Sequence, residues 1–220
     1  MNGISALDDC RIGIATTYGK SYFQFVKALK FLNLKYDSLL PTDIPNYPGS
    51  LIFTTEMESP KSANQLILNE DILKEDPTVI QGIIIEKLDS GLNQHELIIG
   101  IDPGQRIGLV VMYLGKEIER GLYTSPDELA SHVAKILGGL RANKKIVKIG
   151  NGNMQIAKQI TSLLNLKFCS HFELEFVDEQ KTTRKIKNYN KRGERDIMSA
   201  KYIAQRQGYR HFVLPLSRTG

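Results

Sequence analysis

The chain has few cysteines and no long apolar segment, and these absences exclude several classes of protein. Its two cysteines, Cys10 and Cys169, lie far apart and fit no metal-ligand spacing, so we expect reduced thiols in a cytoplasmic protein. No stretch approaches the roughly 20 apolar residues that span a bilayer. The N-terminus lacks the basic and apolar regions of a secretory signal, so no membrane partner is expected.

Residues for several other kinds of catalysis are also sparse. The four histidines show no metal-site spacing, and no G-x-S-x-G motif marks a serine hydrolase. A sugar kinase or actin-like ATPase would need a second phosphate loop in a duplicated domain, and residues 1–92 contain none.

Charge is unevenly distributed along the chain, whose net charge is +5. Residues 1–92 contain 8 basic and 12 acidic residues, a balance of −4, whereas residues 93–220 contain 21 and 12, a balance of +9. A positive excess of this size suits a polyanionic partner, although ordinary surface variation could also produce it. The polar segment 87–96 contains the Ser90-Gly91 break, so we place a domain boundary after residue 92.

The first 92 residues are expected to form a small α/β domain of unknown role. Sequence patterns predict strands over residues 11–19, 35–41 and 50–55, and helices over residues 20–33 and 76–88. The apolar face of the first helix is assigned to Phe23, Val26, Leu29 and Phe31. The isoleucine run 83–85 fits a strand as well as a helix, and segment 54–58 is interpreted as an exposed loop.

Residues 93–220 are expected to form a mixed five-stranded sheet flanked by helices. Strands are predicted over residues 96–102, 106–115, 116–125, 144–152 and 172–179, and helices over residues 125–142, 153–165 and 195–208. Three consecutive strands followed by alternating helices and strands imply hairpins beside parallel crossovers. Ser125, Pro126 and Glu128 predict the start of the first of these helices through a capping box.

Carboxylates follow the ends of several of these elements. Asp102 ends the first strand, Asp178 and Glu179 end the last strand, and Glu194 and Asp196 open the last helix. Carboxylates that converge at the strand ends of an α/β sheet need a compensating cation, and Mg²⁺ prefers such oxygen ligands. Each acid alone also fits an ordinary turn, a solvated strand end or a first helical turn. What favours a shared metal site is that these acids occur together at the ends of elements in one predicted fold.

Four short motifs in order resemble those of one nuclease superfamily. These are GIDPGQRIGLVV (100–111), IGNGN (149–153), FVDEQKTT (176–183) and DIMSAKYIAQ (196–205). Together they resemble the RNase H-like superfamily, in particular RuvC-type Holliday-junction resolvases and their YqgF relatives. The IGNGN turn is similar to that of the YqgF-like domain of Tex-type RNA-binding transcription factors. The resemblance implies an RNase H-like fold for residues 93–220.

The resemblance also implies a set of site residues. Asp102, Glu179 and Asp196 would be the catalytic carboxylates that bind Mg²⁺ or Mn²⁺, and Arg106 would contact a phosphate beside Asp102. The choice of Glu179 over Asp178 comes from the family. RuvC itself carries its second acid at the fourth strand, where this chain has IGNGN, and typical YqgF proteins lack the N-terminal domain.

A basic segment, residues 181–195, lies between two of the implied ligands. Its seven basic residues, expected to bind the phosphate backbone, are Lys181, Arg184, Lys185, Lys187, Lys191, Arg192 and Arg195. Tyr189 could stack on a base. A solvated loop or an exposed helix face is the alternative interpretation.

These observations favour a metal-dependent nuclease that hydrolyses phosphodiester bonds in structured or branched DNA or RNA. Two metal ions in such a site can activate a water and stabilise the leaving oxygen. The alternatives are a non-catalytic nucleic-acid-binding module with an eroded RNase H-like fold, and a protein-interaction scaffold. The choices between DNA and RNA, and between monomer and homodimer, are left open.

Overall fold

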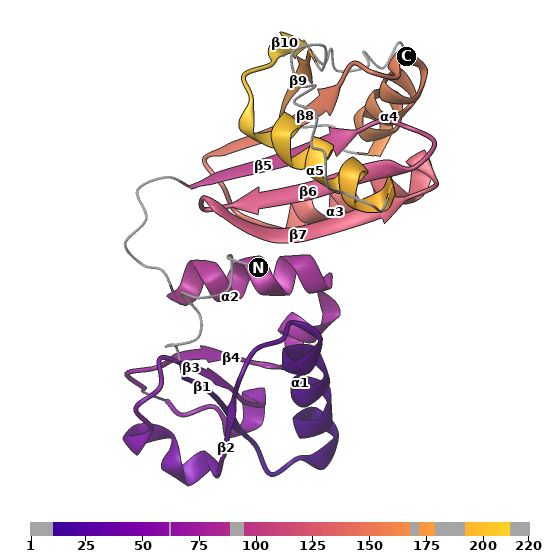
Figure 1. The fold of residues 1–220 in the computed structure, drawn as a ribbon. Helices are drawn as coiled ribbons and strands as arrows, with labels where there is room; N and C mark the ends of the chain where they lie inside the picture. Colours follow the sequence, from indigo (N-terminus) through magenta and orange to yellow (C-terminus); the bar gives the residue numbers. More distant parts are fainter. Residues whose placement is uncertain (1–10, 62, 89–94, 168–171, 179–191, 212–220) are drawn as a thin grey trace, which may run out of the picture. The chain divides into compact units, whose positions relative to one another are not determined.

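A computed structural model describes the chain except for residues 1–10, 62, 89–94, 168–171, 179–191 and 212–220 (Figure 1). The chain divides into two compact units, residues 1–92 and residues 93–220. Within the described residues, no helix is both long and apolar enough to cross a membrane. Cys10 and Cys169 lie outside the described ranges.

The first unit is built on a small, entirely parallel sheet with strand order β2-β1-β3-β4. Its strands are β1 (Ile12–Ala15), β2 (Asp37–Leu39), β3 (Leu51–Phe53) and β4 (Leu66–Leu68). Its helices are α1 (Gly19–Phe31), α2 (Pro77–Leu88) and the short 3₁₀ helices η1 (Pro41–Asn46), η2 (Glu56–Glu58) and η3 (Glu70–Lys74). The sequence patterns did not predict β4 or the three 3₁₀ helices, which are all too short to show a periodicity.

The face through which helix α1 packs on the sheet shares Leu29 with the predicted face but otherwise differs from it. Phe25 and Leu29 are fully buried, and the Phe25 ring lies 5.5 Å from that of Phe53 on β3. Phe23 and Phe31, which we assigned to the apolar face, are 67% and 73% exposed. Alternating aromatic residues along a helix point in different directions, so only one of the candidate faces can meet the sheet.

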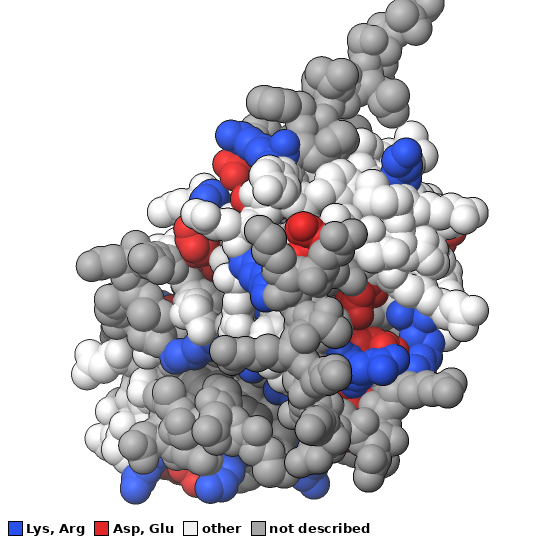
Figure 2. All heavy atoms as spheres, turned by 45° about the horizontal axis from the view of Figure 1, so that its top comes forward, with Lys and Arg blue, Asp and Glu red and all other residues white. Residues whose placement is uncertain are grey.

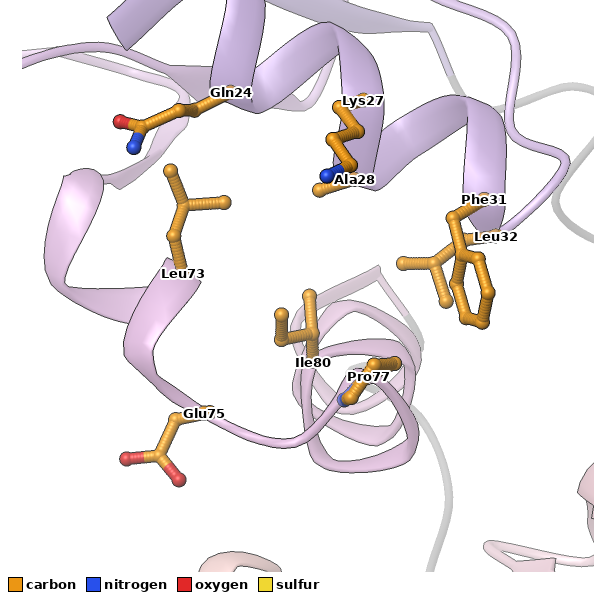
Figure 3. Close-up of a pocket in the computed structure, with 9 residues that line it drawn as sticks. All are labelled: Gln24, Lys27, Ala28, Phe31, Leu32, Leu73, Glu75, Pro77 and Ile80. Atoms are coloured by element: carbon orange, nitrogen blue, oxygen red, sulfur yellow. The ribbon is translucent and has the colours of Figure 1, made fainter.

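The isoleucine run 83–85 is helical, as part of α2, whose residues 79, 80, 84 and 85 are buried. The start of α2 is that predicted by the sequence, because the Asp76 carboxylate accepts a hydrogen bond from the Thr78 amide at 3.0 Å. A hollow of about 390 Å³ lies between α1, the end of η3 and the first turns of α2 (Figure 3). Its wall includes Ala28, Leu32, Leu73 and Ile80.

The second unit is a mixed sheet of strand order β10-β9-β8-β5-β6-β7. Its strands are β5 (Glu96–Asp102), β6 (Ile107–Tyr113), β7 (Lys116–Tyr123), β8 (Lys144–Gly150), β9 (Glu173–Val177) and β10 (Tyr209–His211). Strands β5, β6 and β7 form an antiparallel meander, and β8 and β9 run parallel to β5. The helices are α3 (Pro126–Gly139), α4 (Met154–Lys167) and α5 (Arg192–Gln205).

The two faces of this sheet carry different helices. Helix α5 packs on β5 and β6, and α3 and α4 pack together on the opposite face (Figure 1). The ends of both α3 and α5 are held by lysines of β8. Lys145 donates to the Leu137 carbonyl of α3 at 2.5 Å, and Lys148, on the other face, donates to the Arg206 carbonyl just after α5. Burial lowers the pKa of Lys145.

The α/β class and the mixed sheet agree with the sequence prediction. A meander whose first strand pairs in parallel with β8, which in turn pairs in parallel with β9 through helical connections, is the topology of an RNase H-like sheet. The sheet has six strands rather than the five expected, because the short strand β10 adds antiparallel to β9. The β6–β7 hairpin turns at Leu114 and Gly115, one residue before the expected position, and both have positive φ, as a two-residue type I′ turn requires.

Candidate nuclease site

Asp102 lies at the carboxyl end of the central strand β5, on the face that α5 covers. It pairs directly with Gly108 of the antiparallel strand β6, so the two residues point to the same face. Gly100 shares this face because side chains alternate along a strand. The Asp102 side chain is partly buried.

Two glycines on this face allow the backbone of α5 to lie against the sheet. A Cβ on Gly100 would stand 2.3 Å from the Ala200 carbonyl oxygen, and a Cβ on Gly108 would stand 2.3 Å from the Asp196 carbonyl oxygen. Residues 196, 200 and 204 form one stripe of the helix, and Ala204 also lies over Gly100. The backbone of Asp196 therefore lies against Gly108, the residue of β6 that pairs with Asp102.

Arg106 and Asp196 form an ion pair across this corner of the unit. The Arg106 Nη2 atom lies 3.1 Å from Asp196 Oδ2, and the two side chains are 42% and 19% exposed. Arg106 immediately precedes β6, in the turn that follows Asp102, so the turn and the first part of α5 are joined by opposite charges. Two aspartates and one arginine thus gather near the carboxyl end of β5.

The end of β9 lies beside the turn after β8. The Asn151 side-chain amide donates to Asp178 Oδ1 at 3.5 Å, and the Asn151 backbone amide donates to the Val177 carbonyl at 3.1 Å. Gly100, Lys148 and Glu175 are register partners in the parallel strands and share the α5 face. Lys148 is 3.7 Å from Glu175, whose carboxylate also accepts from the Gly208 amide. By alternation, residues 175 and 177 face α5, and Asp178 follows directly after the end of β9.

Several of the expected site residues fall outside the described part of the chain. These are Glu179, Lys181, Arg184, Lys185, Lys187 and Lys191. Arg192 opens α5, and Glu194 and Arg195 in its first turn are exposed. Of the three carboxylates implied by the resemblance, two are therefore described, and both belong to the same corner of the sheet.

The described residues fit a magnesium ion only in part. Among them, no group of three or more histidine, cysteine, aspartate or glutamate residues is arranged to hold a metal ion. Asp102 and Asp196 offer hard oxygen donors, and Mg²⁺ often uses only one or two carboxylates together with waters and substrate phosphates. The donor type of these two residues therefore matches a weakly held, hydrated ion. It does not match a site in which protein ligands surround the metal completely.

Charges of both signs are interspersed over the described residues on the face drawn in Figure 2. The ion pairs of β7 are one example: Glu117 contacts Lys201 of α5 at 2.8 Å and also pairs with Arg120. In the described part of the second unit, many of the basic side chains are thus neutralised by acidic partners. The densest run of basic residues is segment 181–195 of the sequence.

Sequence reasoning missed the residues that support the site. Gly100 and Gly108 interrupt otherwise apolar strands, and a glycine inside a strand is a recognised sign of close backbone approach. That sign was available. Lys148 carried no comparable sign, because a basic residue in a strand is usually exposed, whereas here the residue is only 7% exposed.

A second polar cluster lies in the first unit, where strands β1 and β3 end. Glu58 accepts hydrogen bonds from the Thr17 amide at 2.8 Å, the Thr17 hydroxyl at 2.5 Å, the Thr55 hydroxyl at 2.8 Å and the Thr16 hydroxyl. Burial acts to raise the pKa of Glu58, but the hydrogen bonds from Thr16, Thr17 and Thr55 outweigh it and lower the pKa to about 2. Segment 54–58 is therefore not an exposed loop. Thr54 and Thr55 are buried, residues 56–58 form η2, and Glu58 ties the segment to the residues just before α1.

Comparison with known proteins identifies no family. No protein-family model matches the chain, and no curated protein matches it. Among solved structures, a crystal structure of A. aeolicus Argonaute matches with 12% identity and a TM-score of 0.26, over 78% of this chain and 36% of that chain. A structure of Aa-Ago with externally bound siRNA matches with 12% identity and a TM-score of 0.25, over 78% of this chain and 35% of that chain. The chain spans about a third of these proteins, and a likeness this low carries no functional argument.

Proposed function

We propose that residues 93–220 form a metal-dependent nuclease domain of the RuvC/YqgF type, which hydrolyses phosphodiester bonds in structured or branched DNA or RNA. The observation that carries the proposal is the shared position of Asp102 and Asp196. Asp102 ends the central strand β5. Asp196 lies near the start of α5, where its backbone packs on Gly108, the residue of β6 that pairs with Asp102.

In the proposed site, Asp102 and Asp196 hold Mg²⁺ or Mn²⁺, together with Glu179. The choice of Glu179 over Asp178 as the third ligand rests on the resemblance to the YqgF motif FVDEQKTT. When bound, the ion supplies an activated water and neutralises charge on the phosphate. The carboxylates orient the reacting groups, and the partial burial of Asp102 and Asp196 limits competing solvent.

Arg106 and the basic segment 181–195 are proposed to hold the phosphate backbone. The contributing residues of the segment are Lys181, Arg184, Lys185, Lys187, Lys191, Arg192 and Arg195. Such contacts position a nucleic acid without reading its sequence. They suit a substrate recognised by its shape, such as a branched or structured nucleic acid.

A non-catalytic nucleic-acid-binding module is the second candidate. The Arg106–Asp196 ion pair favours it, because an aspartate neutralised by the chain's own arginine needs no metal ion. The same phosphate contacts would then serve binding alone.

A cleavage assay separates the two candidates. Full-length protein is incubated with labelled junction, duplex and single-stranded substrates, with Mg²⁺, with Mn²⁺ and with EDTA. Metal-dependent cleavage that Asp102→Asn abolishes, while binding persists, supports the nuclease. The matched control is Asp127→Asn, which removes an exposed charge from the first turn of α3 and should leave cleavage unchanged. Binding without cleavage of any substrate would leave only the second candidate.

A further inference from the structure

We propose that Arg106 is a displaceable counter-ion of Asp196: a divalent cation competes with it for the aspartate, and the released guanidinium then binds a phosphate of the nucleic acid. This inference rests on the proposed function, since it concerns the regulation of the same site. It makes metal binding and nucleic-acid binding strengthen each other through one side chain.

In the proposed competition, Arg106 and the divalent cation bind the same carboxylate, that of Asp196. Asp196 Oδ2 lies 3.1 Å from Arg106 Nη2, within the distance of an ion pair. Mg²⁺ binds a carboxylate oxygen at roughly 2.0–2.1 Å. A divalent ion on this carboxylate would stand within a few ångströms of the guanidinium, where the two positive charges repel each other.

The packing decides which partner moves. The backbone of Asp196 lies against Gly108, so close that even a Cβ on the glycine would clash with it. Its side chain is 19% exposed and short. The side chain of Arg106 is long and 42% exposed, and it extends from the turn before β6. Asp196 therefore stays in place, and Arg106 swings away toward solvent.

Once displaced, Arg106 is suited to a phosphate. A guanidinium offers five N–H donors in a fixed planar arrangement that matches phosphate oxygens. Arg106 remains attached to the turn that follows Asp102, so its reach covers the surroundings of the proposed reaction centre. Because coupling between two ligands is reciprocal, a cation that frees Arg106 must tighten nucleic-acid binding by the same factor by which nucleic acid tightens cation binding.

A purely structural ion pair predicts a different behaviour. If Arg106 only fastens the β5–β6 turn to the start of α5, its removal lowers stability and leaves the cation affinity unchanged or weaker. The two interpretations therefore differ in the sign of one measurable quantity, the cation affinity of a variant without the guanidinium.

Direct Mn²⁺ binding to the full-length chain, followed by electron paramagnetic resonance without nucleic acid, tests the proposal. Arg106→Gln should bind Mn²⁺ about three- to tenfold more tightly than the wild type, as expected for loss of a partly exposed competing ion pair. Arg106→Lys retains a positive charge and should stay within about twofold of the wild type. The matched control is Arg120→Gln, which removes an arginine of β7 that pairs with Glu117 and should change the affinity less than about twofold. Equal Mn²⁺ affinity in wild type and Arg106→Gln would overturn the proposal.

The second measurement is nucleic-acid affinity with and without Ca²⁺ at constant ionic strength, using a branched DNA. Wild-type affinity should rise with Ca²⁺, and Arg106→Gln should lose this rise while keeping its Mn²⁺ affinity. A rise that persists in Arg106→Gln contradicts the proposal. If the wild type cleaves with Mn²⁺ and Arg106→Gln shows neither effect, the proposed nuclease stands and only this inference fails. If no variant binds Mn²⁺, both fail.

Discussion

The backbone of Gly108 lies so close to Asp196 that a Cβ on the glycine would stand 2.3 Å from the Asp196 carbonyl oxygen and 2.7 Å from its carbonyl carbon. Backbone atoms cannot move aside as a flexible side chain can. The absence of a side chain at residue 108 is therefore what permits α5 to carry Asp196 to the end of β5.

Gly108→Ala should accordingly displace the first turns of α5 and lower the free energy of unfolding by at least about 2 kcal/mol, a typical cost of overpacking. Chemical denaturation of the full-length chain measures the change. Gly121→Ala in β7 is the matched control, because the nearest atoms to its Cβ belong to side chains, the closest being a Tyr123 ring carbon at 3.3 Å, and side chains can shift. Equal stability of the two variants would contradict the close packing of α5.

The first unit should be sensitive to acid through Glu58. Its pKa is depressed from 4.5 to about 2, so the ionised carboxylate stabilises the folded state fully above pH 4.5. This contribution should disappear as the pH falls from 4.5 toward 2. Amide hydrogen exchange of β1 and β3 against pH measures it, because these strands end beside the cluster.

The variant Glu58→Gln should show the same loss at neutral pH, of about 1–2 kcal/mol, because it removes the charge that the three threonines bind. Glu56→Gln, at an exposed residue of the same 3₁₀ helix, is the control and should leave exchange nearly unchanged. An acid profile that Glu58→Gln fails to flatten would show that another group is responsible.

Replacing Lys185, Lys187, Lys191 and Arg192 with alanine should weaken binding to every nucleic-acid sequence alike. Each lost phosphate contact should lower the slope of log affinity against log salt by about 0.7 to 0.9. Fluorescence anisotropy at several salt concentrations measures both quantities. The control replaces four exposed lysines of the first unit, Lys20, Lys27, Lys30 and Lys61, and removes the same charge. An unchanged slope in the first variant would make segment 181–195 a solvated surface.

Residues 93–220 should fold alone and retain nucleic-acid binding, because the sheet β5–β10 and its three helices form one compact unit and carry the positive excess. Circular dichroism with cooperative thermal unfolding, followed by a binding titration, checks both parts. An insoluble fragment would show that the first unit completes its core. A folded fragment that no longer binds would assign part of the recognition to residues 1–92.

The hollow between α1 and α2 should accept a larger apolar side chain. Ala28→Leu places three additional carbons against Leu73 and Ile80 and should stabilise the chain by about 0.5–1 kcal/mol. Urea denaturation measures the gain. Ala28→Ser adds no apolar surface and should give none, so an equal response of the two variants would mean that the hollow is not filled by the leucine.

The sequence alone determined the features that depend on neighbours within about one helical turn. Ser125 starts α3 because its hydroxyl accepts the Glu128 amide three residues later, at 3.3 Å. Asp76 starts α2 in the same way. Apart from β10, the order of strands and helices in residues 93–220 and the α/β class also followed from local periodicity.

Tertiary packing decided what local patterns left open. The isoleucine run 83–85 suits a helix or a strand, and its surroundings made it helical. Which phenylalanine of α1 is buried depended on how the helix docks on β3.

The same holds for the proposed site. Alternation along β5 puts Asp102 and Gly100 on one face, but it cannot say what covers that face. The chain returns to it with α5, about 90 residues later, where Asp196 meets both Gly108 and Arg106. Contacts over such a separation depend on backbone approach and packing of the whole unit, which no short stretch of sequence encodes.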